Sequence, residues 1–322
     1  MRSSKPLVSV IMAVRNGEKS LRKTLNSLLR QTYTNIEIVI VNDASVDKTK
    51  VILDEFAKKD NRVKVITNKK RLERCVSRNI AIEASKGKYI AVNDADDISF
   101  PHRIETEVKY LESNPEVYLV GGRANILDES GRKIGISWGK RVPVDVTMKL
   151  IENNVLVHSS IMFRNSKEFF YREKFLHAED YDLYLQIVAN GYLVHLLSNV
   201  LVEYRSKKDL LYDEYLIDQL VFSYTVRKLC KQKLRYGKDS HEDVDREYMY
   251  DRFPKKDLDF LYFLQSFTHK DFKDARKRMI KIIKEYGFSI KNGFYFIDTF
   301  LGGGLLSTGK YIKRAILSLS LF

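Results

Sequence analysis

Short apolar runs alternate with segments of helical periodicity through the first 130 residues of the chain. Unbroken apolar runs are typical of strands that are buried on both faces of a sheet. These runs are Leu7–Val14, Ile36–Val41, Val63–Ile66 and Tyr89–Val92. Between them, apolar residues at helical spacing predict helices at Glu18–Arg30, Lys48–Lys58 and Cys75–Ala84. The alternation, with its short connections, predicts an α/β fold in which helices flank a doubly wound, mostly parallel sheet.

Two further parts of the chain have different patterns. In residues 117–205 we expect strands at Tyr118–Val120, Ser160–Phe163, Leu193–His195 and Val200–Tyr204, and a helix at Asp180–Ala189. After Lys208, aromatic-rich segments predict helices at Leu210–Leu234, Leu258–Phe267 and Phe272–Tyr286. We therefore predict a mixed-sheet domain over residues 1–208 and a helical C-terminal region over residues 209–322.

The chain is basic, with 56 Lys and Arg against 42 Asp and Glu and a net charge of +14. This charge favours an anionic partner, such as nucleic acid, a phospholipid surface or a phosphorylated substrate. Two cysteines, Cys75 and Cys230, are too few for a disulfide framework or a zinc site and indicate a reducing compartment. Because we find no secretory signal and no apolar run of about 18 residues, we expect a cytoplasmic protein.

Polar turns follow several of the predicted strands. They read Ala-Val-Arg-Asn-Gly at 13–17, Val-Asn-Asp-Ala-Ser at 41–45 and Asn-Asp-Ala-Asp-Asp at 93–97. A single turn of this kind is more often a helix cap than a ligand site. Several turns at the carboxyl ends of parallel strands, however, meet at one crevice, and ligands of such sheets bind there. The set therefore favours a ligand site.

The turn at 93–97 places Asp94, Asp96 and Asp97 close together. Such crowding of carboxylates is unfavourable unless a cation neutralises them or a proton is shared. The cluster ends a buried strand and precedes a helix that we expect to open at Pro101. Hard oxygen ligands in this position suit Mg²⁺ or Mn²⁺, which can bridge to the phosphates of a substrate.

Taken in order, these motifs resemble glycosyltransferase family 2. The residues that carry the resemblance are V-S-V-I-M-A-V-R-N-G at 8–17, T-L-N-S-L-L-R-Q-T-Y at 24–33, I-V-I-V-N-D-A-S-V-D-K-T at 38–49, S-R-N-I-A-I-E-A-S-K-G-K-Y-I-A-V-N-D-A-D-D at 77–97 and H-A-E-D-Y-D-L-Y-L at 177–185. The resemblance covers residues 6 to about 205 and leaves the tail outside. It implies the GT-A fold and an inverting transferase that uses a nucleotide sugar.

The resemblance implies roles on the donor side of the site. Ala13, Arg15 and Asn16 match the family's first nucleotide-binding turn. Asp43 matches the aspartate that bonds the nucleotide base, typically uracil, and Asp94 matches the first acid of an Asp-x-Asp motif, near the ribose. These matches imply a UDP-sugar donor.

A metal ion and a general base are implied as well. Asp96 matches the second acid of the motif, which holds Mn²⁺ or Mg²⁺ on the sugar diphosphate, and Arg74 or Arg78 is a candidate for facing a phosphate. Asp180 matches the base that deprotonates the acceptor hydroxyl. The alternative for Asp180 is a helix cap or a first-turn acid. In either position, the N-terminus of the helix favours the anionic carboxylate.

Two positions depart from the family pattern. Glu73 stands where the family commonly has a glycine, in the charged segment 71–74. Ser206-Lys207-Lys208 follows Tyr204-Arg205 where many members have a histidine that joins the metal site, and Lys207 is a candidate phosphate-facing cation instead. His158 and Trp138 are candidates for acceptor contacts, with core packing as the alternative for each.

We therefore predict a metal-assisted inverting transferase that moves a sugar from a UDP-sugar to a hydroxyl of a glycan or lipid-linked acceptor. The lysine-rich helix at 270–284 is compatible with a solvated face or with peripheral contact with the inner face of the cell membrane. Acceptor choice is expected to depend on residues 123–175 and on the tail.

Other classes of protein remain as alternatives. A sugar-1-phosphate nucleotidyltransferase would need a glycine-rich basic loop after the first strand, where this chain has Arg-Asn-Gly-Glu-Lys at 15–19. A non-catalytic nucleotide-sugar or glycan-binding protein would tolerate loss of the acids that are present here. A nucleic-acid-binding protein would use the net charge, and we expect little such binding at physiological salt.

Overall fold

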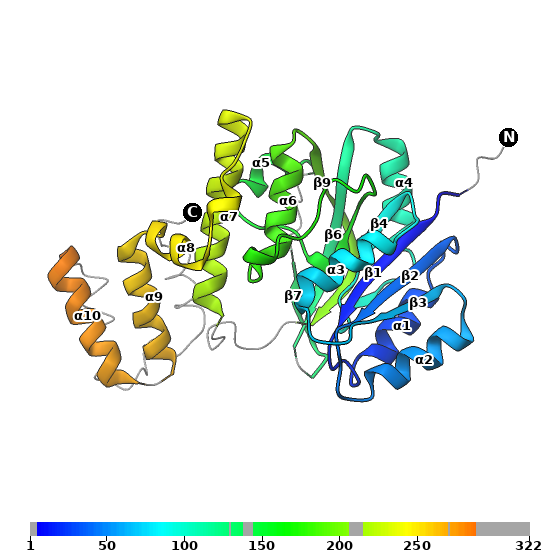
Figure 1. The fold of residues 1–322 in the computed structure, drawn as a ribbon, viewed down its shortest axis with the longest axis horizontal. Coiled ribbons are helices and arrows are strands. Elements are labelled where there is room, and N and C mark those ends of the chain that lie inside the picture. The colour runs from blue at the N-terminus through cyan, green and yellow to red at the C-terminus, as the bar shows by residue number, and fades with distance from the viewer. Residues whose placement is uncertain (1–4, 129, 138–143, 206–214, 270, 288–322) are drawn as a thin grey trace.

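In this computed structural model, residues 5–128, 130–137, 144–205, 215–269 and 271–287 are described (Figure 1). The strands are β1 (Val8–Val14), β2 (Ile36–Asn42), β3 (Val63–Thr67), β4 (Tyr89–Val92), β5 (Ile98–Ser99), β6 (Val117–Leu127), β7 (Lys133–Ile136), β8 (Ile161–Arg164) and β9 (Leu193–Arg205). Over the described ranges they form one nine-stranded sheet in the order β3-β2-β1-β4-β8-β6-β9-β5, with β7 paired to β6.

The sheet is mixed and mostly parallel, as predicted. β1 runs parallel to β2 and to β4, and β2 runs parallel to β3. β8 is antiparallel to β4 and β6, whereas β6 and β9 are parallel. The carboxyl ends of β1, β2 and β4 therefore lie at one edge of the sheet.

Helices cover both faces of this sheet. On one face lie α1 (Leu21–Leu29), α2 (Thr49–Lys59) and α4 (Arg103–Ser113), which share a core with Val10 and Met12 of β1. On the other face lie α3 (Glu73–Ala84) and α6 (Glu179–Ala189), which share a core with Ile11. The alternation of β1 side chains follows from the two-residue period of a strand and confirms the doubly wound arrangement.

The remaining helices follow or flank the sheet. They are α5 (Thr147–Leu150), α7 (Leu216–Tyr236), α8 (Arg246–Arg252), α9 (Lys255–Thr268) and α10 (Phe272–Tyr286). α7 packs against α6, and α9 packs against α10 at the end of the molecule away from β2 and β3 (Figure 1). The core is continuous from Tyr184 of α6 to Val221 and Phe222 of α7. The domain boundary at residue 208 stays a prediction.

Some elements differ from the expected ones. The two strands expected at Leu193–His195 and Val200–Tyr204 are one continuous strand, β9, because the exposed Ser198 and Asn199 interrupt only the apolar pattern. β9 lies close against Gly122 of β6, where an added Cβ would approach the Leu201 side chain to 2.3 Å. The short helix α8 was not expected, and α4 begins at Arg103 rather than Pro101. Within the described ranges, no helix is long and apolar enough to cross a bilayer.

Candidate active site

A cavity of about 460 Å³ opens at the carboxyl ends of β1 and β4. Its lining residues are Ala13, Val14, Arg15, Asn16, Gly17, Ser20, Arg74, Arg78, Asp94, Ala95, Asp96, Asp97, Tyr204 and Arg205. The turns after two of the predicted strands thus meet at one crevice. The last two lining residues come from the end of β9, which reaches the same edge of the sheet.

The turn after β1 is tied to the turn after β2. Arg15 Nη1 donates hydrogen bonds to the carbonyl oxygens of Asp43, at 3.1 Å, and Ala44, at 3.3 Å. Asn16 N donates to Ser45 Oγ, and Asn16 Oδ1 accepts from the amide of Val46. Asn16 and Ala44 both have positive φ, at 52° and 48°. Two strained turns therefore support each other at the rim of the cavity.

Asp43 is buried, and its carboxylate faces the start of α3. It accepts from the backbone amides of Leu72, at 2.7 Å, and Glu73, at 3.0 Å. The amide of Asn68 donates to it at 2.9 Å and also bonds Ser77 Oγ. Asp43 thus fixes the start of α3, and its role toward a nucleotide base stays a prediction.

Glu73 occupies the position where the family pattern has glycine, and its backbone is left-handed, with φ at 68°. Glycine adopts this conformation without strain, whereas a residue with a Cβ does not. The hydrogen bond from its amide to Asp43 and an ion pair with Arg71 at 2.7 Å hold the residue in place. Glu73 therefore has a backbone conformation that glycine, the residue common in the family, would adopt without strain.

The acids at 94–97 have three different environments. Asp94 accepts from Arg78 Nη2 at 2.7 Å; burial would raise the pKa of Asp94, but the guanidinium outweighs it and lowers the pKa to about 2. Asp97 is buried and accepts from Ser159 Oγ and from the amide of Arg205. Burial, with Asp94 and Asp96 nearby, raises the pKa of Asp97 to about 8. Asp96 is exposed and lines the cavity.

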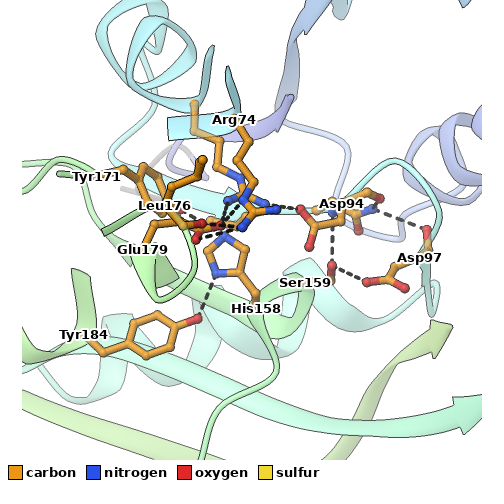
Figure 2. A network of polar contacts seen from close by, with 12 residues as sticks. Arg74, Asp94, Asp97, His158, Ser159, Tyr171, Leu176, Glu179 and Tyr184 are labelled. Carbon is orange, nitrogen blue, oxygen red and sulfur yellow. Dashed lines mark hydrogen bonds and ion pairs between the residues drawn. The ribbon is translucent and has the colours of Figure 1, made fainter. Parts of the chain in front are cut away.

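Figure 2 shows how Asp94 is connected to α6. Arg78 is buried and bridges two carboxylates, with Nη2 on Asp94 and Nη1 on Glu179 Oε1 at 3.1 Å. Arg74 also pairs with Glu179, and the Arg78 guanidinium lies 5.4 Å from the centre of the Tyr171 ring. Because Glu179 opens α6, this network fixes the start of that helix beside the cavity.

His158 lies inside this network rather than at a surface. Its Nδ1 is 2.8 Å from the hydroxyl of Tyr184 and its Nε2 is 3.2 Å from that of Tyr171 (Figure 2). Burial, reinforced by the positive charge of Arg78, lowers the pKa of His158 to about 4. The imidazole is therefore neutral at physiological pH and is held by two tyrosine hydroxyls, and its contact with an acceptor sugar stays a prediction.

Arg103 holds the start of the turn that carries Asp94, Asp96 and Asp97. Neither its side chain nor that of Glu107 is exposed, and Arg103 Nε pairs with Glu107 at 3.3 Å. Arg103 Nη1 donates to Asn93 Oδ1 at 2.9 Å, and Nη2 donates to the carbonyl of Val92 at 2.7 Å. The guanidinium thus holds the two residues that precede Asp94.

Asp180 lies in a second cavity, of about 210 Å³. Its lining residues are Glu152, Asn153, Asn154, Asp180, Tyr181, Gln219, Leu220, Ser223 and Arg227. Asp180 is the second residue of α6, and its Oδ2 accepts from Asn154 Nδ2 at 3.1 Å. The helix cap is Ala178, so Asp180 is a first-turn acid and not the cap.

Residues 9–176 match the sequence profile of Glycosyl transferase family 2. This match covers more than half of the chain. The protein belongs to glycosyltransferase family 2. It is therefore an enzyme that transfers a sugar from a nucleotide sugar, which decides against the nucleotidyltransferase and binding-protein alternatives.

Relatives and solved structures agree with this assignment. A glycosyltransferase of Methanocaldococcus jannaschii is 33% identical over 238 residues, which cover 72% of this chain and 82% of the relative. The UDP-Glc:alpha-D-GlcNAc-diphosphoundecaprenol beta-1,3-glucosyltransferase WfgD of Escherichia coli is 30% identical over 187 residues, 58% of this chain and 71% of WfgD.

Two solved structures establish the GT-A-like fold. The crystal structure of S. aureus TarS 1-349 in complex with UDP superposes with a TM-score of 0.58 at 17% identity, over 88% of this chain and 92% of that one. The mannosyltransferase PcManGT from Pyrobaculum calidifontis, in complex with GDP-Man and Mn²⁺, gives a TM-score of 0.61 at 15% identity. This superposition covers 98% of this chain and 84% of PcManGT. The predicted fold class is confirmed.

The acids of this family 2 transferase fit a cation that arrives with its substrate. In the parts of the chain that the structure describes, no group of three or more His, Cys, Asp or Glu side chains could enclose a metal ion. Mg²⁺ is usually bound by one or two carboxylates together with substrate phosphates and water. Asp96 is exposed at the cavity, whereas Asp94 is paired with Arg78. The site thus offers one exposed carboxylate, which suits a cation bound together with substrate phosphates and water.

The structure brings most of the predicted donor-side residues together. Ala13, Arg15, Asn16, Arg78, Asp94 and Asp96 line the first cavity, whereas Asp43 faces α3 and Asp180 lines the second. Sequence reasoning missed Glu179 and Ser159, although Glu179 directly precedes Asp180 in the matched motif. Trp138 and Lys207 lie outside the described residues.

Proposed function

We propose that this transferase moves a sugar from a UDP-sugar to a hydroxyl of a glycan or lipid-linked acceptor, with inversion at the anomeric carbon. The observation that carries the proposal is the cavity that gathers Arg15, Arg78, Asp94 and Asp96 at the strand ends, next to the helix that bears Asp180. UDP in the TarS complex and the lipid diphosphate acceptor in the name of WfgD support this choice of donor and acceptor.

In the proposed reaction, the Asp180 carboxylate takes the proton of the acceptor hydroxyl. The hydroxyl oxygen then attacks the anomeric carbon from the face opposite the diphosphate. The bond from that carbon to the diphosphate oxygen breaks, and the nucleoside diphosphate leaves with the bonding electrons. The two cavities suit this reaction, because the cavity with Asp94 and Asp96 would hold the donor and the cavity with Asp180 would admit the acceptor.

Asp96 is the residue we propose to hold a divalent cation on the sugar diphosphate. Mn²⁺ or Mg²⁺ bound there would stabilise the negative charge that develops on the leaving diphosphate. Mn²⁺ in the PcManGT complex supports the choice of ion. Arg78 and Arg15 would add positive charge from the protein itself, and Asp94 would lie near the ribose.

For the rest of the chain we propose an acceptor-side or membrane-side role. α10 exposes Lys273, Lys277 and Lys284, and a lysine-rich helix is attracted to anionic lipid surfaces. This supports peripheral contact with the inner face of the cell membrane. It agrees with an acceptor whose sugar is attached to a lipid.

A donor panel tests the proposed function. The purified protein is mixed with Mn²⁺ and with UDP, GDP, ADP, CDP or TDP, and its melting temperature is measured; hydrolysis of the matching nucleotide sugars is scored in parallel. We expect stabilisation and slow hydrolysis with uridine nucleotides. Stabilisation by GDP in preference to UDP would contradict the UDP-sugar assignment.

A further inference from the structure

The cavity around Asp180 is built by residues from three separate parts of the chain. Asn153 and Asn154 come from the loop after α5, and Asp180 and Tyr181 come from the start of α6. The opposite wall comes from α7, which lies beside α6 (Figure 1) and follows the matched residues 9–176. Part of the surface that faces the proposed base therefore lies outside the residues that the family profile matches.

Polar groups without partners line this cavity. Over the described residues, the side chains of Asn153, Gln219 and Ser223 have no hydrogen-bond partner. Carboxamide and hydroxyl groups can donate and accept at the same time, as sugar hydroxyls do. Asn154 differs, because its amide already bonds Asp180 at 3.1 Å. The free groups match a ligand that presents several hydroxyls at once.

The charges in the cavity restrict the ligand further. Glu152 and Asp180 contribute carboxylates, whereas Arg227 contributes a guanidinium whose Nη1 donates to the carbonyl of Glu152 at 2.7 Å. Two carboxylates against one guanidinium give the lining a net negative charge, which repels an anionic substituent. A phosphate or a carboxylate on the entering sugar is therefore disfavoured here.

We propose that this cavity binds an uncharged sugar ring of the acceptor, and that Gln219 and Ser223 of α7 determine which ring is accepted. The inference rests on the proposed function, because it takes Asp180 as the base that meets the acceptor hydroxyl. The cavity volume of about 210 Å³ equals that of about seven water molecules in the liquid and suits a single ring. Any phosphate of a lipid-linked acceptor would lie outside this cavity.

Saturation-transfer NMR tests the proposal without requiring turnover. The probes are the methyl β-glycosides of glucose, galactose and N-acetylglucosamine, with methyl β-glucuronide as the matched anionic probe, each added to protein with UDP and Mn²⁺. We expect saturation of at least one neutral glycoside and at least fivefold less for the glucuronide. The double variant Gln219→Ala/Ser223→Ala should lower the neutral signal at least fivefold, whereas Gln232→Ala, which removes the same amide from a part of α7 outside this cavity, should leave it unchanged.

The outcomes separate this inference from the proposed function. Saturation of none of the neutral glycosides, preference for the glucuronide, or undiminished binding in the double variant would overturn the inference. UDP binding and donor hydrolysis, measured on the same samples, report on the proposed function alone. Glycoside binding that depends on Gln219 and Ser223, combined with no donor hydrolysis, would leave the sugar site established and the proposed reaction wrong.

Discussion

Arg103 and Glu107, one helical turn apart on α4, form an ion pair in which neither side chain is exposed to solvent. Two charges removed from water are stable only when each has partners, and breaking such a pair is more costly than replacing it entirely. Here the guanidinium also holds Val92 and Asn93, the residues before Asp94. The pair thus connects the stability of α4 to the geometry of the acid cluster.

Arg103→Met should destabilise the protein by about 3–5 kcal/mol, because Glu107 is left buried without its partner. The double variant Arg103→Met/Glu107→Leu removes both charges and should recover part of this loss. Urea unfolding followed by circular dichroism measures both changes in the free energy of unfolding. A double variant less stable than the single one would show that the ion pair is not the source of the effect.

Replacing Glu73 by Gly should stabilise the protein by about 0.5–1 kcal/mol. The left-handed backbone costs a residue with a Cβ about 1–2 kcal/mol, and the greater freedom of glycine in the unfolded chain offsets part of the gain. Glu73→Ala is the matched control, since it removes the carboxylate that pairs with Arg71 but keeps the Cβ. Equal melting temperatures for the Gly and Ala variants would argue against backbone strain at this position.

His158 should make stability depend on pH in the range where histidine titrates. Its pKa in the folded protein is about 4, so below about pH 6.5 the unfolded chain binds a proton that the folded protein does not. Stability should therefore fall as the pH decreases from 6.5 toward 4, by about 1.6 kcal/mol between pH 6.5 and 5.0.

His158→Gln removes the titrating group and should flatten this dependence in denaturant titrations. The charged groups that act on His158, namely Arg78, Arg74, Asp94 and Asp180, are present in both proteins. The difference between the two pH profiles therefore isolates the imidazole. Identical slopes between pH 6.5 and 5.0 would mean that His158 binds its proton over the same pH range in the folded and the unfolded states.

Asp96→Ala should abolish stabilisation by UDP that depends on Mn²⁺, and leave the fold intact because Asp96 is exposed. The measurement is the melting temperature with UDP in the presence of Mn²⁺ or of EDTA. If the wild-type protein bound UDP equally well with Mn²⁺ and with EDTA, the metal assignment would be wrong.

Asp180→Asn should lower the rate of transfer by roughly 10²–10⁴-fold, because the amide cannot accept the proton of the acceptor hydroxyl. The affinity for the UDP-sugar should change by less than about threefold, since Asp180 lies outside the cavity proposed to hold the donor. Steady-state kinetics with both substrates varied separate the two effects. Near-normal turnover in the Asn variant would assign Asp180 a purely structural role in the first turn of α6.

The parts of the site that could be predicted are those that the local sequence determines. Apolar runs give strands, and polar turns at their ends meet because the strands are parallel, so the grouping of Arg15 with Asp94 and Asp96 was predictable. The bridge from Arg78 to Glu179 spans 101 residues and depends on how α6 packs against α3, for which the sequence carries no local pattern. The hydrogen bonds from the amides at the start of α3 to the Asp43 carboxylate also have no local sequence pattern, and the role of Asp43 toward a nucleotide base stays a prediction.

Chain order separates the cavity proposed for the donor from the far wall of the Asp180 cavity: the described lining of the first ends at Arg205, whereas that wall begins at Gln219. A gene that recombines between these points would exchange the α7 wall and keep the first cavity together with Asp180. New acceptor preferences can therefore evolve by replacement of a single C-terminal segment while the nucleotide sugar stays the same. Hybrid enzymes joined after β9 are the corresponding route for engineering, provided that the apolar contacts between α6 and α7 are matched.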